Sequence, residues 1–240
     1  MQQAMFDRWV EELDWGEEFS DALLKDLERD LQKGLHNFVN GIDKVVRGRD
    51  YTKIDHRALP KVYTLLSCAC SMQNPRVVEV ILRHCTKEYI ATASLNGKTA
   101  LTHAIAKNRQ DIVKLLLDAD ADVNQVPGDN TEAAKDFSIY GVTPLGVAIS
   151  SKATLDAKKD MIEMLLKRNA DINKPNRRGT TPIFWAVVYE SPLIEFLVDK
   201  NANLEQISRP KHSRRGETPL DRAREVKNGS EAVVLDLLFR

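Results

Sequence analysis

Four side chains of types that bind metal ions lie close together in the sequence: Cys68, Cys70, His84 and Cys85. A structural zinc ion needs four converging ligands of this kind, and about two to four residues usually stand between paired cysteines. Only one residue separates Cys68 from Cys70, which is too close for the usual pair. Cys70 also lies in an apolar segment, where a free cysteine behaves as a small buried hydrophobic residue. We therefore expect no metal site.

His103 is a candidate for acid–base chemistry, which requires a positioned partner. No serine, cysteine and aspartate can be assigned to a triad with it from the sequence. The motifs of nucleotide-binding loops, zinc proteases and serine hydrolases (G-x-x-x-x-G-K-[ST], G-x-G-x-x-G, H-E-x-x-H and G-x-S-x-G) do not occur in the 240 residues. The sequence therefore predicts no catalytic residue, no cofactor and no enzymatic activity.

The composition is that of an ordinary globular protein. Lysine plus arginine and aspartate plus glutamate both number 35, which argues against a surface devoted to nucleic acid or to an anionic membrane. No apolar run approaches the ~18 residues that a membrane span needs. The first residues carry acids and no apolar signal-peptide segment, and three cysteines suit a reducing compartment. We expect a cytoplasmic protein, while export by a specialised secretion system stays open.

One pattern recurs five times along the chain. Each copy has a threonine with an alanine five residues later: Thr64–Ala69, Thr99–Ala104, Thr143–Ala148, Thr181–Ala186 and Thr218–Ala223. A second, apolar block follows each copy: Val77–Leu82, Ile112–Leu117, Met161–Leu166, Leu193–Val198 and Val233–Leu238. Three blocks lead into a matching tail: Ala121–Asn124, Ala170–Asn173 and Ala202–Glu205. Threonine is a good N-cap and proline suits the first helical position, so the Thr-Pro pairs predict helix starts.

The second blocks predict helices that are covered on nearly all sides. Ile112–Leu117, for example, is interrupted by a single lysine. A helix that is apolar all round must be sandwiched between neighbours. One helix pair cannot bury such a surface alone, whereas a stack of pairs can. The pattern therefore predicts an array of stacked helix pairs.

This layout resembles the ankyrin repeat, which has a unit of about 33 residues and the signature T-P-L-H-x-A. The resemblance covers about three quarters of the chain and implies an all-α solenoid of helix-turn-helix units with short β-turn or hairpin loops. The implied ankyrin domain is 56–240, and its repeats are about 58–93, 95–126, 139–175, 177–207 and 214–240. The first copy has neither Thr-Pro nor the glycine that stands two residues before the threonine in the other four copies, so we interpret it as a degenerate or capping repeat. The last copy stops where a C-terminal cap would end.

The signature histidine of the family is absent from every copy. The residues in its place are Ser67, Thr102, Gly146, Phe184 and Asp221. Its hydrogen bonds to neighbouring turns should therefore be missing, and we expect a less regular array. Three insertions lengthen the repeats, and we expect loops at 125–138, between the helices of the third repeat at 150–157, and at 206–215.

Residues 1–55 do not fit the repeat. Ser20 can cap a helix with an apolar stripe (Leu23, Leu24, Leu27, Leu31, Leu35 and Phe38), and Met5–Leu13 suggests a shorter helix before it. Ten acids against three basic residues give residues 1–30 a net charge of −7. Two interpretations stay open. Either the helices cap the first repeat with their acids facing water, or the acids form a docking surface for a basic partner.

The resemblance places a concave binding groove along the turn tips and the exposed sides of the first helices. The implied partner-binding residues are Leu95, Asn96, Lys98, Lys107, Tyr140, Val142, Arg177, Arg178, Val188, Tyr189, Arg214 and Arg215. Tyrosine and arginine are enriched at binding hot spots, which favours Tyr140, Arg177, Arg178, Tyr189 and Arg215.

The resemblance implies a non-catalytic module that binds one specific protein partner, as an adaptor, an inhibitor, or a dedicated bacterial effector or immunity protein. The alternative is an enzyme or toxin-like effector whose site combines the N-terminal extension with the 125–138 loop. We expect no nucleic-acid partner, because the four basic residues Arg209, Lys211, Arg214 and Arg215 form one loop and not a continuous stripe. The sequence leaves the oligomeric state undetermined, with a monomer favoured.

Overall fold

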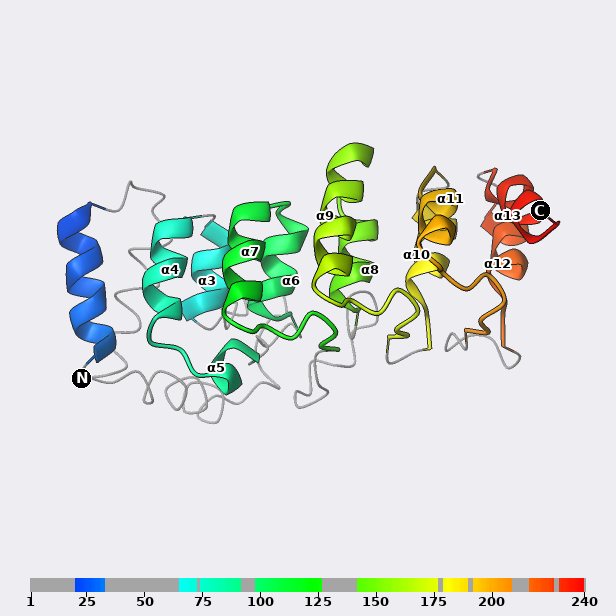
Figure 1. Cartoon of the computed structure of the whole chain (residues 1–240). Helices are drawn as coiled ribbons and strands as arrows, with labels where there is room; N and C mark the ends of the chain where they lie inside the picture. Colours follow the sequence, from blue (N-terminus) through cyan, green and yellow to red (C-terminus); the bar gives the residue numbers. More distant parts are fainter. Residues whose placement is uncertain are drawn as a thin grey trace, which may run out of the picture. The chain divides into compact units, whose positions relative to one another are not determined.

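The chain is built from helices. The computed structural model describes residues 20–32, 65–72, 74–91, 98–126, 142–176, 179–189, 192–208, 216–226 and 229–239 (Figure 1). Residues 21–32 are helical. The further helices are α3 (Leu65–Met72), α4 (Pro75–Leu82), α5 (Lys87–Ala91), α6 (Ala100–Ala106), α7 (Gln110–Asp118), α8 (Pro144–Ser150), α9 (Leu155–Lys167), α10 (Pro182–Tyr189), α11 (Pro192–Asp199), α12 (Pro219–Val226) and α13 (Ser230–Phe239). Within these ranges there is no strand, and the predicted all-α class is confirmed.

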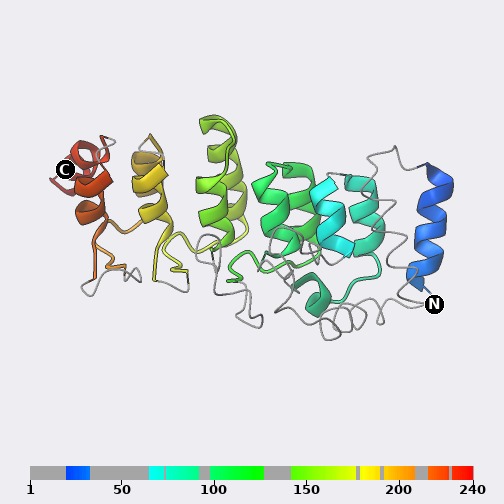
Figure 2. The same ribbon diagram turned by 180° about the vertical axis from the view of Figure 1, so that it is seen from behind.

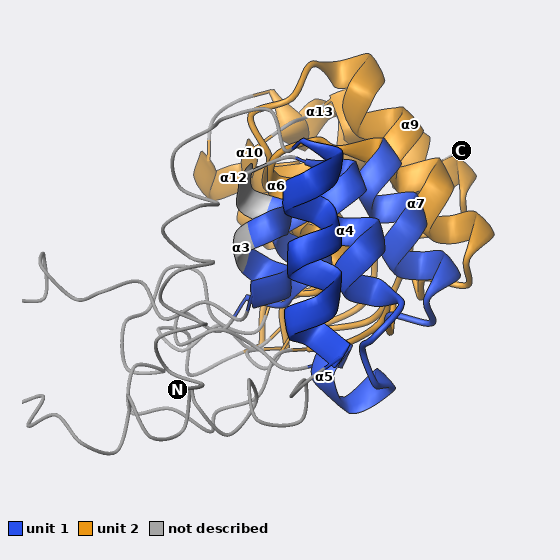
Figure 3. Cartoon of the chain, turned by 90° about the vertical axis from the view of Figure 1, so that its left-hand side faces the viewer, with its two compact units in different colours: residues 1–104, 111–121, 129–135 blue, residues 105–110, 122–128, 136–240 orange. Residues whose placement is uncertain are grey.

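The helices divide into two compact units, shown in two colours in Figure 3. Unit 1 consists of residues 1–104, 111–121 and 129–135. Unit 2 consists of residues 105–110, 122–128 and 136–240. Nothing in the described part of the chain has the length and apolar character of a membrane-spanning helix.

In unit 2 the helix pairs stack as the apolar blocks predict. The first helices α8, α10 and α12 lie against one another in turn, and so do the second helices α9, α11 and α13 (Figures 1 and 2). On α11, which has a neighbour on each side, Leu193, Ile194 and Leu197 are completely buried. A second helix is therefore apolar on two sides because it has two neighbours to cover it.

Threonine side chains start most of the first helices, but not all. The Thr143 hydroxyl accepts a hydrogen bond from the Gly146 N–H (3.1 Å), and Thr99 and Thr218 cap in the same way. At Thr181 the Phe184 N–H donates to the backbone carbonyl instead (3.1 Å). The Thr181 hydroxyl oxygen is buried and has no hydrogen-bond partner among the described residues. The threonine at this repeat position thus caps the helix through its hydroxyl in three repeats, whereas at Thr181 the hydroxyl does not cap the helix.

In unit 2 the tail motifs are linked to one another by side-chain hydrogen bonds. Asn173 donates from its side chain to the Asn201 carbonyl (3.1 Å) and accepts from the Asn203 N–H (2.8 Å). Asn124 makes the same two bonds with Asn169 (2.9 Å) and Asp171 (2.8 Å). The receiving residues Asn169 and Asn201 have φ values of 64° and 69°, a left-handed conformation that asparagine tolerates. In the third tail Glu205 replaces the linking asparagine.

Half of the insertion at 150–157 is helical, so the loop there is shorter than predicted. Only residues 151–154 separate α8 from α9, whereas α9 has 13 residues against 9 in α7. Thr154 caps the lengthened helix by accepting from the Ala157 N–H (3.4 Å). Aspartate and lysine in the added turn favour helix, so the extra residues extend α9.

The other two insertions fall largely outside the described residues. Of 125–138, only residues 125 and 126 are described. The insertion at 206–215 is closed at its base by two backbone hydrogen bonds between Ser208 and Glu217 (2.9 and 2.8 Å). A Cβ at Gly216 would lie 2.1 Å from a methyl group of Ile207, so this closure requires glycine.

In unit 1, the helix of residues 21–32 packs its apolar stripe as predicted. Leu24, Leu27 and Leu31 are buried, and the Ser20 hydroxyl accepts from the Leu23 N–H (3.3 Å). Leu35, Phe38 and the predicted helix at Met5–Leu13 lie outside the described residues.

Two acids of this helix form ion pairs with basic residues of unit 1, although their side chains stay partly or largely exposed. Asp21 forms an ion pair with Arg76 of α4. Glu28 lies 3.7 Å from Arg83 and 3.6 Å from His84. Arg76 and Arg83 thus offset part of the negative charge of this segment from within the same chain, and both interpretations of the acids stay predictions.

The short helix α5 was not predicted. It follows the first helix pair, where later pairs carry the tail motif, and Thr86 caps it by accepting from the Tyr89 N–H (3.2 Å). Tyr89 and Ile90 are buried, while Lys87 pairs with Asp120 (2.7 Å). Two buried side chains outweigh the weak intrinsic stability of a five-residue helix.

Candidate functional site

Five of the twelve predicted partner-binding residues are described by the structure. Lys98 lies half-buried in unit 1, and Lys107 is exposed just after α6. Val142, Val188 and Tyr189 belong to unit 2. The other seven lie outside the described residues: Leu95, Asn96, Tyr140, Arg177, Arg178, Arg214 and Arg215.

The C-terminal end of α10 presents two aromatic rings. Trp185 and Tyr189 are stacked, with ring centroids 5.6 Å apart and an angle of 8° between the ring planes. They are four residues apart, so successive turns of the helix place them on the same face. Tyr189 is 57% exposed, while Trp185 is half-buried. The more buried ring therefore supports the more exposed one.

The Trp185 ring packs against Gly146 of the neighbouring helix α8. A Cβ at position 146 would lie 3.4 Å from Cδ1 of Trp185 and 2.7 Å from Cγ1 of Val142. The absence of a side chain thus lets Val142 and the indole ring approach the backbone of α8 from two sides. Val142, Gly146, Trp185 and Tyr189 form one surface, which we call the aromatic patch.

The same relationship recurs between α10 and α12. In the repeat register Arg222 takes the position of Trp185, and Phe184 takes that of Gly146. The Arg222 guanidinium lies 5.5 Å from the centre of the buried Phe184 ring. In both cases a residue of one first helix covers the signature-histidine position of the preceding one.

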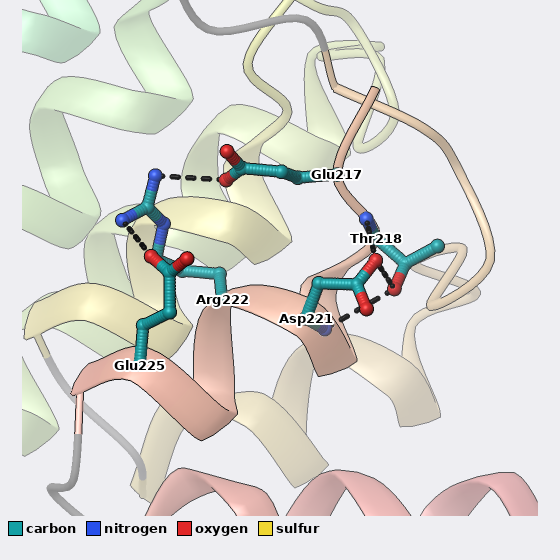
Figure 4. Close-up of polar contacts among 5 residues, drawn as sticks. All are labelled: Glu217, Thr218, Asp221, Arg222 and Glu225. Carbon is teal, nitrogen blue, oxygen red and sulfur yellow. Dashed lines mark hydrogen bonds and ion pairs between the residues drawn. The ribbon is translucent and has the colours of Figure 1, made fainter. Parts of the chain in front are cut away.

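Two carboxylates hold Arg222 in place (Figure 4). Its guanidinium donates to Glu217 (2.8 Å) and to Glu225 (2.8 Å). Glu217 comes from the loop base and Glu225 from α12 itself. The arginine is 27% exposed, so this is a fixed, partly buried cation. Sequence reasoning missed it, because nothing in the local pattern of α12 places Glu217 beside position 222.

Asp221 replaces the signature histidine with a local hydrogen-bond network. Its carboxylate accepts from the Thr218 N–H (2.9 Å) and from the Thr218 hydroxyl (2.7 Å), while its own N–H donates back to that hydroxyl oxygen (3.2 Å) (Figure 4). The backbone hydrogen bond, followed by the hydroxyl bond, lowers the pKa of Asp221 below its usual value. This arrangement is a capping box and fixes the start of α12.

Three of the residues that we considered for metal binding or catalysis, Cys70, His103 and Cys85, are shielded from solvent to a large extent. Cys70 is completely buried on α3, and His103 is buried on α6. Burial raises the pKa of the Cys85 thiol to about 12, so it stays protonated at neutral pH and is a poor metal ligand. Over the described ranges, no group of three or more His, Cys, Asp or Glu side chains converges as a metal site.

Comparisons with known proteins agree with the architecture. Residues 36–126 match the family model for ankyrin repeats in three copies. The match begins at residue 36, within the segment 1–55 that we assigned to the N-terminal extension, so that boundary stays a prediction.

Two curated relatives cover about half of the chain. One is an ankyrin repeat domain-containing protein of Stachybotrys chartarum, SAT10, at 27% identity over 53% of this chain and 5% of the relative. The other is a tyrosine-protein kinase of Hydra vulgaris, HTK16, at 28% identity over 55% of this chain and 20% of the relative. The chain thus spans only a small part of either protein, and the kinase name describes the Hydra protein alone.

The stacked helix pairs, the capped first helices and the linking tails agree with these matches. Ankyrin repeats generally mediate protein–protein interaction and are typically non-catalytic. Residues 36–126 therefore contain ankyrin repeats, and the helical architecture is that of an all-α ankyrin solenoid.

Proposed function

We propose that this protein binds one specific protein partner through the first-helix surface of its repeats, the predicted concave face, with the aromatic patch as its centre. The observation that carries this proposal is Tyr189, which is 57% exposed although it is stacked on a half-buried tryptophan.

The patch has the properties of a binding hot spot. Tyrosine and tryptophan are enriched at hot spots, because a large ring loses few rotatable bonds when it becomes buried. Here the stacking and the Gly146 seat already fix the Trp185 ring, so little further ordering is needed on binding. Val188, half-buried beside Tyr189, extends the apolar area.

The fixed cation of Arg222 favours one specific partner over any protein with an apolar surface. Its guanidinium is held between Glu217 and Glu225, so its remaining donor capacity has a fixed direction. Such a cation can pair with a carboxylate or a carbonyl group at the rim of an interface.

The seven predicted tip residues outside the described ranges would add polar contacts around this centre. The arginines at 177, 178, 214 and 215 favour a partner that offers acidic side chains to the turn tips. A protein of this kind acts by occupying its partner's surface, as an adaptor or an inhibitor, and we place it in the cytoplasm.

A quantitative capture experiment tests the proposal. The full chain and a Tyr189→Ala variant are used in parallel to capture proteins from the native source, and the bound proteins are compared by mass spectrometry. We expect one stoichiometric protein whose recovery falls at least about tenfold with the variant.

Two further variants make the comparison specific. Tyr189→Phe keeps the stacked ring and should retain the partner. Ile207→Ala removes another large apolar side chain of similar exposure (60%) outside the patch and should also retain it. Equal recovery with Tyr189→Ala and wild type would show that the aromatic patch is not the binding site.

A further inference from the structure

The helix next to the aromatic patch, α12, carries an excess of negative charge. Glu217, Asp221 and Glu225 lie on this helix or at the loop base before it, together with one guanidinium, that of Arg222 (Figure 4). Three carboxylates against one guanidinium leave a net charge of −2. Backbone and hydroxyl hydrogen bonds lower the pKa of Asp221, so its carboxylate is ionised at neutral pH. Arg224 does not offset this charge, because it is paired with a carboxylate of α13 (3.3 Å).

One of these carboxylates, Glu225, is held in position and still open to solvent. Arg222 donates to its Oε2 atom at 2.8 Å, and the Glu225 side chain is 60% exposed. The other carboxylate oxygen, Oε1, takes no part in this bond. An ordered carboxylate can accept a charge-assisted hydrogen bond from a partner at a small further cost in side-chain entropy.

Glu225 and the exposed ring of Tyr189 lie on neighbouring first helices. In the repeat register Glu225 takes on α12 the position that Val188, the neighbour of Tyr189, takes on α10. Helices α10 and α12 pack on each other, and the axes of packed helices are about 8 to 10 Å apart. Helices α8 and α10 contain no charged residue. The charge beside the aromatic patch therefore comes from α12 and is negative.

The Tyr189 ring has one covered face and one available face. Trp185 is stacked on it in nearly parallel orientation, yet the tyrosine remains 57% exposed. The open face of an aromatic ring attracts a cation. A guanidinium suits such a place, because it can lie flat on a ring while its N–H groups reach a carboxylate.

The chain already uses this combination inside the helix stack. The Arg222 guanidinium lies 5.5 Å from the centre of the Phe184 ring and donates to two carboxylates. An arginine from a partner would repeat the arrangement further along α10, with Tyr189 as the ring and Glu225 as the carboxylate.

We propose that the aromatic patch and Glu225 together receive an arginine side chain of the protein partner, whose guanidinium covers the Tyr189 ring and pairs with Oε1 of Glu225. The negative charge of α12 favours a cation here over an acidic or a neutral group. This inference rests on the proposed function. It adds a basic anchor at the helix surface to the acidic side chains expected opposite the turn tips.

An NMR titration of the isotope-labelled full chain tests the inference with two defined probes. N-acetyl-arginine methylamide carries the guanidinium, and N-acetyl-citrulline methylamide has nearly the same shape without the charge. The indole N–H signal of Trp185 reports binding, with probe added up to about 100 mM at constant ionic strength because a single side chain binds weakly. We expect the arginine probe to have a dissociation constant at least about threefold lower than that of the citrulline probe.

Two glutamate variants make the comparison specific. Glu225→Gln keeps the size of the side chain, removes its charge and should abolish most of the difference between the probes. Glu79→Gln is the matched control, because Glu79 is 54% exposed and pairs with an arginine of its own helix (3.0 Å), but lies in unit 1. It should keep the wild-type difference.

Equal dissociation constants for the two probes, or no shift of the Trp185 signal with either, would overturn the inference. A difference that Glu225→Gln leaves unchanged would also overturn it. These results would leave the aromatic patch as the site of an apolar anchor. Retention of the partner by Tyr189→Ala, by contrast, would remove the patch as a binding site, so the two failures are distinguishable.

Discussion

The side-chain amide of Asn173 joins two consecutive helix pairs by accepting a hydrogen bond from the Asn203 N–H at 2.8 Å and donating one to the Asn201 carbonyl at 3.1 Å. Asn124 makes the equivalent pair of bonds one repeat earlier. A side-chain amide has both a donor and an acceptor at its tip, so it can make both bonds at once. The tail asparagines therefore fix the spacing between repeats, and with it the first-helix surface that carries the aromatic patch.

Asn173→Asp should destabilise unit 2 by about 1 kcal/mol, because the carboxylate keeps the acceptor but faces the Asn201 carbonyl without a donor. Urea denaturation followed by circular dichroism measures the change. Glu205→Ala is the control, since it alters the same tail position where no linking asparagine exists, and it should change the stability by less than about 0.5 kcal/mol. Equal effects from both variants would contradict a linking role for Asn173.

Thr143→Val and Thr181→Val should have different effects, although both replace the same repeat position. Thr143→Val removes the acceptor of the Gly146 N–H and should cost about 1 kcal/mol. Thr181→Val replaces a buried hydroxyl whose oxygen accepts no hydrogen bond from the described residues, so its effect should be neutral or stabilising. Denaturation midpoints of the two variants test this difference. A larger loss at Thr181 would show that its hydroxyl does cap α10.

Gly146→Ala should destabilise the protein even though alanine is the better helix former by about 1 kcal/mol. The new Cβ would lie 2.7 Å from Cγ1 of Val142, a β-branched side chain with little rotational freedom, and 3.4 Å from Trp185. We expect a net loss of about 1 kcal/mol and a changed tryptophan emission spectrum. A more stable variant with unchanged fluorescence would mean that Gly146 does not seat the indole ring.

Asp221 should contribute to the stability of the wild type in a pH-dependent way. Its folded-state pKa is lowered by the hydrogen bonds from Thr218, so its contribution is complete above the unfolded value of 3.8 and is lost as the pH falls through the folded value. The melting temperature of wild type should exceed that of Asp221→Asn at pH 6, and the gap should shrink below about pH 4. A gap that stays constant down to pH 2 would exclude the carboxylate as the source.

The helix pairs could be predicted because their cause is local. Thr-Pro pairs start first helices, and apolar blocks such as Leu193–Val198 mark second helices. The added turn of α9 was not predicted, because a polar insertion fits either a loop or an exposed helical face. Helix α5 was not predicted either, because its stability depends on the burial of Tyr89 and Ile90 in the folded protein and not on a local pattern.

The candidate site was predicted only in part. Val142 and Tyr189 follow from the repeat register, but their contact through Gly146 and Trp185 depends on how α8 meets α10. The sequence shows that Gly146 replaces the signature histidine. It does not show that the Trp185 ring packs against this glycine. Glu217 reaches Arg222 because a backbone bridge closes the preceding insertion, which no local pattern encodes.

The most direct test of the account is the dissociation constant of the captured partner, measured by isothermal titration calorimetry with wild type and with Tyr189→Ala. We expect a dissociation constant at least about tenfold higher for Tyr189→Ala, with an unchanged denaturation midpoint. A dissociation constant equal to that of wild type would contradict binding at the aromatic patch.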